Sequence, residues 1–166
     1  MPTITARLFD YETLKSRLKA EDRIVIVSCN SCARQSDNLG GEQGLQKLAG
    51  KLADDGFNVV HRELMPIACH PGQWKELLDD KRLRALFDKA DVIIPLSCQA
   101  GEKRMEDMLP GLRLFRVTRT LGKGVSGPDG ARLTEPGEGV DIRVDSPEGI
   151  PLAEAAGCLG LHAGSF

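Results

Sequence analysis

The sequence predicts an α/β protein, a three-layer sandwich with a mainly parallel, flavodoxin-like or Rossmann-like sheet and an irregular tail rich in glycine and proline. Two observations predict this fold. Short β-branched runs alternate with amphipathic segments of helical period, which is typical of βαβ units. From residue 122 onward, glycine and proline interrupt the chain every few residues. We therefore expect an α/β metal-binding domain over residues 1–121 and an extension over residues 122–166, packed on it or beside it.

The elements follow from local patterns along the chain. Asp10 is expected to cap a short helix in which Tyr11 and Leu14 share a face. The continuous β-branched run at residues 24–27 predicts a strand buried on both faces. The remaining segments that show strand or helix patterns are assigned in the same way. Further strands are expected at 57–60, 91–96 and 112–118, helices at 42–54, 74–90 and 102–109, short β segments at 131–133 and 140–144, and one or two helical turns at 151–157.

Composition excludes several classes of function. The chain has 166 residues, of which 41% are hydrophobic and 28% are charged, a balance typical of one globular domain. The 22 basic and 24 acidic residues leave a net charge of −2, so we expect no nucleic-acid partner. No apolar run approaches the length of a membrane span and no secretory signal is evident, so we expect no membrane insertion and a cytoplasmic location.

Four of the five cysteines follow predicted strands. Cys29 and Cys32 come at the end of the first predicted strand, Cys69 follows the second after a short extension, and Cys98 follows the third. The carboxyl ends of parallel strands meet at one edge of a sheet, which is where open α/β sheets bind ligands. The sequence therefore predicts that these four side chains converge on one site.

Four thiolates in one place repel each other unless a cation neutralises them, so we expect a metal centre at this site. The wide separation of Cys69 and Cys98 from the C-x2-C pair favours an iron–sulfur cluster, most simply [4Fe–4S], over a zinc site built from two short pairs. Zinc stays as an alternative. A second alternative is a thiol–disulfide oxidoreductase that uses Cys29 and Cys32, although a polar segment follows Cys32 where such motifs open a helix.

Other residues carry weaker signals. His70, next to Cys69, is a candidate extra ligand or proton donor, and Cys158 in the tail is expected to lie outside the site. Gly40 and Gly41 permit a close backbone approach before a helix start. There is no Ser/His/Asp set, no phosphate-binding loop and no pair of carboxylates suited to acid–base catalysis.

Together these motifs resemble a known family. The residues are Ser28-Cys29-Asn30-Ser31-Cys32, Gly40-Gly41-Glu42, Cys69, Ala90-Asp91-Val92-Ile93 and Ser97-Cys98-Gln99-Ala100-Gly101. They resemble the amino-terminal domain of the small, MetV-type zinc/iron–sulfur subunit of methylenetetrahydrofolate reductase. The likeness covers about residues 20–123. A more distant resemblance is to the small iron–sulfur subunit that links hydrogenase to heterodisulfide reductase, which also has a Cys-Asn-x-Cys turn.

The resemblance implies a non-catalytic subunit of an oxidoreductase complex in one-carbon or other anaerobic metabolism, rather than a complete enzyme. Its metal would be an iron–sulfur cluster or zinc, and its partner a redox protein or flavoprotein subunit, which carries the flavin and folate sites of the family. The chain also departs from the pattern. Ser36 stands where a third closely spaced cysteine is common, and the cysteine-rich carboxyl-terminal half of the family is replaced by the Gly/Pro-rich segment.

Overall fold

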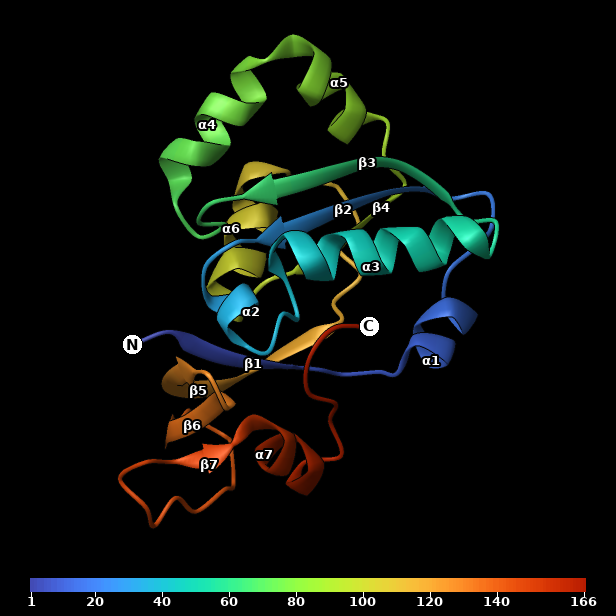
Figure 1. Cartoon of the computed structure of the whole chain (residues 1–166). Helices are drawn as coiled ribbons and strands as arrows, with labels where there is room; N and C mark the ends of the chain where they lie inside the picture. The colour runs from blue at the N-terminus through green and yellow to red at the C-terminus, as the bar shows by residue number, and fades with distance from the viewer.

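A three-stranded parallel sheet is the framework that positions the cysteines (Figure 1). The computed structural model describes all residues 1–166 as a mixed α/β fold with seven helices and two sheets. The parallel sheet has the order β3-β2-β4 and consists of β2 (Arg23–Cys29), β3 (Asn58–Met65) and β4 (Val92–Leu96). The expectation of a parallel sheet among these strands is therefore confirmed.

Strand β2 lies between its two neighbours, with β3 on one side and β4 on the other. Helix α3 (Gly41–Asp54) connects β2 to β3, and α4 (Pro71–Asp79) and α5 (Lys81–Asp88) then lead from β3 back across β2 to β4. Figure 1 shows α3 in front of the sheet and α6 (Gln99–Met108) behind it. The carboxyl ends of β2 and β4 therefore flank the switch point at which open α/β sheets form ligand crevices.

The expected central elements are present, with changes at their ends. Helix α1 (Tyr11–Ser16) is capped by Asp10, whose carboxylate accepts the Thr13 amide at 2.7 Å. The helix expected at 74–90 is two helices, because Asp80 begins α5 by accepting the amides of Arg82 and Leu83 at 2.8 and 3.2 Å. The strand expected at 112–118 is reduced to a single parallel bridge between Leu114 and Ile93.

Residues 122–166 do not form an irregular tail. The second sheet is antiparallel, with the order β1-β5-β6-β7, and joins the start of the chain to its end. Its strands are β1 (Thr3–Arg7), β5 (Thr118–Gly127), β6 (Gly130–Pro136) and β7 (Ile150–Pro151), and α7 (Leu152–Cys158) packs against it. The expected boundary between residues 121 and 122 falls inside β5. The β segment expected at 140–144 is absent.

Glycines in this region allow strands to approach closely rather than breaking them. A Cβ atom on Gly124 would lie 1.9 Å from the carbonyl oxygen of Arg132 in the neighbouring strand, and Gly122 has a φ of 149°. Only glycine fits such positions, so a high glycine content is compatible with a hairpin here.

Each sheet has its own apolar core. The larger cluster surrounds the parallel sheet and includes Trp74 and Phe87, and the smaller one lies between the antiparallel sheet and α7. None of the helices combines the length and the apolar character needed to cross a bilayer.

Candidate cysteine site

The four cysteines singled out by the sequence lie at or just beyond the carboxyl ends of the three parallel strands. Cys29 is the last residue of β2, and Cys32 is the first residue of α2 (Cys32–Gln35), a short helix that replaces the expected polar loop. Cys69 follows β3, and Cys98 is the N-cap residue of α6 directly after β4. Because these strands are adjacent and parallel, the four backbone positions share one edge of the sheet.

Cys32 and Cys98 are neighbours across the switch point, and each shifts the pKa of the other. Their thiols interact, and the hydrogen bond from Cys98 is the main reason why the pKa of Cys32 lies well below its usual value, at about 5. Hydrogen bonds from Thr3 and Ser31 act in the same direction. The pKa of Cys98 is raised, first by this pairing with Cys32 and then by burial. The two thiols therefore titrate as a coupled pair.

Cys29 is almost fully buried and belongs to the larger apolar core. Its neighbour Ser28 donates its hydroxyl to the carbonyl of Gly41 at 3.0 Å, so Ser28 points towards α3. Successive strand side chains point to opposite faces, so Cys29 lies on the face away from α3, where α6 covers the sheet (Figure 1).

Cys69 is exposed, but the segment that carries it is held at both ends. The carbonyl of Ala68 accepts the indole N–H of Trp74 at 2.7 Å, and the carbonyl of Cys69 accepts the Nε of Arg104, on α6, at 3.3 Å. A Cβ atom on Gly101 would lie 3.3 Å from the Cβ of Ala68, so this segment packs closely on the first turn of α6. Helix α6 therefore contacts the Cys69 segment and is also the helix that Cys98 caps.

The side chains do not complete a single-ion site. No three histidine, cysteine, aspartate or glutamate side chains anywhere in the chain are arranged so that they could hold one metal ion. Of the four cysteines, Cys32 and Cys98 are neighbours whose titrations are coupled. His70 is exposed at the start of α4, and Cys158 is exposed at the end of α7, in the part of the chain that packs on the antiparallel sheet.

Strand β1 contributes neighbours that the sequence reasoning missed. Thr3 lies beside Cys32, and both Thr3 and Thr120 line a cavity next to Cys98. No local pattern indicates this role, because β1 is placed by pairing with β5, where Thr3 lies opposite Lys123.

Ser36, where the resembling family often has cysteine, links the site to β1. Its buried hydroxyl accepts the amide of Thr5 at 3.0 Å and lies 3.0 Å from the carbonyl oxygen of Cys32, to which it donates. The residue thus fixes the first turn of α2 against the second sheet.

We expect Ser36→Ala to lower the free energy of unfolding by about 1–2 kcal/mol, because the buried amide of Thr5 loses its acceptor. Urea titration followed by circular dichroism measures this loss. The control is Ser16→Ala, which removes an exposed hydroxyl bonded to the carbonyl of Thr13 and should change stability by less than about 0.5 kcal/mol. Equal losses in the two variants would contradict the structural role of Ser36.

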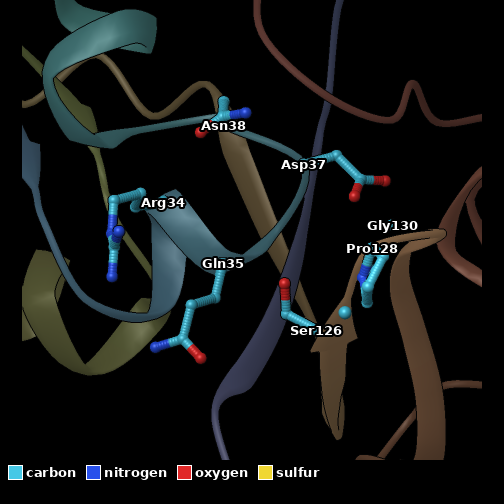
Figure 2. Close-up of a pocket in the computed structure, with 8 residues that line it drawn as sticks. Arg34, Gln35, Asp37, Asn38, Ser126, Pro128 and Gly130 are labelled. Atoms are coloured by element: carbon cyan, nitrogen blue, oxygen red, sulfur yellow. The ribbon is translucent and has the colours of Figure 1, made fainter.

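A separate polar cavity of about 470 Å³ lies between residues 34–38 and the turn at residues 126–130 (Figure 2). No hydrophobic residue lines it. The carboxylate of Asp37 turns towards the β5–β6 hairpin, where it accepts the amide of Ala131 at 2.6 Å, while Arg34 lies on the opposite side. The polar groups do not converge on one point, so this cavity is a junction between the two sheets and not a second ligand site.

Comparisons with known protein families, curated proteins and solved structures find no match to this chain.

Proposed function

We propose that this chain is an iron–sulfur accessory or electron-transfer subunit, in which Cys29, Cys32, Cys69 and Cys98 hold one cluster, [4Fe–4S] in the simplest case. The observation that carries the proposal is the gathering of four thiol-bearing positions at one edge of the parallel sheet, around the amino-terminal half of α6. When bound, such a cluster supplies one-electron transfer.

The donor set fits this group chemically. Iron binds thiolate rather than thiol, and the environment of Cys32 already favours its thiolate through hydrogen bonds from Cys98, Thr3 and Ser31. Cys98 is the N-cap residue of α6, so the partial positive charge at the start of this helix would offset part of the negative charge of the thiolates. Lys103 and Arg104 of the same helix are paired with Asp107.

The geometry favours a cluster over a single zinc ion. A structural zinc site needs four ligands around one point, and no three candidate side chains have that arrangement. The cysteines of a cluster each bind a different iron atom, so their sulfurs need not meet. Cys29 is buried at the end of β2 and Cys69 is exposed after β3, and both backbone positions share the edge of the sheet that carries Cys32 and Cys98.

The expected setting is a complex. A chain with one cluster would pass electrons to another protein, so we propose a redox or flavoprotein subunit as the partner, in a methylenetetrahydrofolate reductase-like or another anaerobic system. Cys69 is the exposed member of the set, so the surface around it is where that partner would receive electrons.

Metal analysis of anaerobically purified protein tests this proposal. We expect a brown protein with about four iron atoms per chain and a matching amount of acid-labile sulfide. Cys29→Ser, Cys32→Ser, Cys69→Ser and Cys98→Ser should each lose most of the iron. The control is Cys158→Ser, which should keep it.

Two results would overturn the proposal. A colourless protein without iron, before and after reconstitution with iron and sulfide, would exclude a cluster, and one equivalent of zinc would favour the zinc-stabilised interaction module. Full iron content in Cys69→Ser would remove that residue from the ligand set.

A further inference from the structure

We infer that the free edge of β3 is a docking site for an extended segment of another protein, in which lysine or arginine alternates with apolar residues. The segment adds a strand beside residues 61–65 and places its cations over an acidic groove between β3 and the α4–α5 pair. The inference goes beyond the proposed function, because it concerns a different surface and requires no metal.

The outer edge of β3 has no partner in this chain. β3 is the outer strand of the parallel sheet, on the side of α4 and α5, and pairs only with β2 (Figure 1). The carbonyl of Met65 accepts the amide of Asn30 at 2.8 Å, so Met65 turns its peptide groups towards β2. Successive residues of a strand turn theirs to opposite sides, so Arg62 and Leu64 direct their N–H and C=O groups outward. Such a row of unpaired groups is a template for another strand.

Nothing in the fold blocks this stretch of the edge. Edge strands are often protected by proline, by a bulge or by a covering element. Pairing of β3 with β2 is regular from His61 to Met65, and no proline lies between these residues. Two cavities, of about 390 and 200 Å³, adjoin the strand, and Leu64 lines both of them. The neighbouring helices therefore leave the edge open at Leu64.

The larger cavity forms the acidic groove. No lysine or arginine lines it, and its walls combine carboxylates with apolar side chains. The lining residues are Glu63, Leu64, Met65, Pro66, Gln73, Glu76, Leu77, Asp80 and Leu83. Glu76 is exposed and takes part in no ion pair, while Glu63 is paired with His61 at 2.8 Å. The groove thus offers negative charge beside apolar surface.

This combination suits the long side chains of lysine and arginine. Their apolar stems can pack along Leu77 and Leu83 while their charged ends meet the carboxylates. The side chains of an added strand alternate between the two faces of the sheet. Those on the other face meet the smaller cavity, where Leu45 and Leu64 supply apolar surface. Alternation of basic and apolar residues therefore matches both faces of the edge.

Charge matching favours another protein over a second copy of this chain. Residues 58–65 contain one arginine and no lysine, and a second copy would bring the same acidic groove to the edge. Like charges that face each other across an interface oppose association. A basic segment of a different protein meets no such opposition.

A synthetic peptide tests the inference on the full-length protein. The probe is a fluorescent peptide of about six residues, the usual length of a strand, in which valine and lysine alternate. The control peptide has glutamate in place of lysine. By fluorescence anisotropy we expect saturable binding of the lysine peptide, weakened by salt, and binding of the glutamate peptide at least about tenfold weaker. Bound peptide should slow hydrogen exchange of the Arg62 and Leu64 amides at least about tenfold, as measured by NMR.

Methylated peptides show whether the backbone pairs. N-methyl groups are placed on one or the other set of alternate peptide amides, which leaves the charge unchanged. Because an added strand turns alternate amides towards β3, one methylated form should lose binding and the other should keep it.

Two pairs of variants locate the site. Glu76→Lys should weaken binding of the lysine peptide about tenfold, whereas Glu154→Lys, the same change at an exposed position on α7, should not. Arg62→Pro removes an outward N–H that β2 does not use and should lose most of the binding, whereas Arg62→Ala should keep it. Circular dichroism establishes that each variant is folded.

Three results would overturn the inference: no saturable binding, equal affinity for the lysine and glutamate peptides, or equal binding of both methylated forms. A dimer in light scattering, with slow exchange of the Arg62 and Leu64 amides before any peptide is added, would also overturn it by assigning the edge to a second copy. None of these results bears on the cluster, which is tested by iron content.

Discussion

Replacing Trp74 by alanine is expected to lower the free energy of unfolding by about 3–5 kcal/mol, the usual cost of truncating a buried aromatic side chain. Trp74 is fully buried in the larger core, and its ring packs edge-on against Phe87 with 6.0 Å between centroids. The indole also donates to the carbonyl of Ala68, next to Cys69. The substitution should therefore destabilise the fold and release the Cys69 segment at the same time.

A second variant separates these two effects. Trp74→Phe keeps most of the ring packing but leaves the carbonyl of Ala68 without its donor, so we expect a smaller loss of about 1–2 kcal/mol. Because Trp74 is the only tryptophan, unfolding has to be followed by circular dichroism. The control is Lys75→Ala, an exposed neighbour that should change stability by less than about 0.5 kcal/mol. A loss below about 1 kcal/mol in Trp74→Ala would contradict its place in the core.

The parallel sheet was predictable because its strands are recognisable from their own residues. The run at residues 24–27 is β-branched throughout and lies within β2, and residues 92–96 form β4 as expected. The second sheet was not predictable in this way. Strand β1 is short, and its pairing partner β5 lies near the other end of the chain. In the sequence, glycines such as Gly122 and Gly124 suggest a loop. In the structure they allow β5 to pack closely against the backbone of β6, a contact that cannot be seen from the sequence.

The site was predictable to the level of backbone positions and no further. The parallel direction of the strands follows from the alternation of strands and helices, and this suffices to bring the ends of β2, β3 and β4 to one edge. Which sulfurs meet depends on side-chain direction. Cys29 lies in the larger core because its side chain alternates with that of Ser28 along the pleated strand. Cys32 lies near Cys98 because helix α2 begins at Cys32, where the sequence predicted a loop. Neither fact follows from spacing alone.

Replacing Gly40 by alanine is expected to cost about 3 kcal/mol, the upper part of the usual range for overpacking. A Cβ atom at this position would lie 2.7 Å from the Cβ of Ala33, 2.9 Å from the carbonyl oxygen of Leu96 and 3.1 Å from that of Cys29. Two of these neighbours are backbone atoms at the ends of β4 and β2, which cannot rotate away. The added methyl group would therefore push apart the two strand ends that carry the cysteines.

Gly50 is the matched control for this prediction. It lies on the exposed side of α3, with nothing within 4 Å of the position that a Cβ atom would take, so Gly50→Ala should raise stability by about 0.5–1 kcal/mol. Alkylation of Cys98 in the native protein supplies a readout besides stability, since it should become faster in Gly40→Ala and stay unchanged in Gly50→Ala. If both variants unfold at the same urea concentration as the unaltered chain, the close approach at Gly40 is wrong. If only Gly40→Ala is destabilised while Cys98 stays protected, Gly40 supports the fold without positioning the cysteine pair.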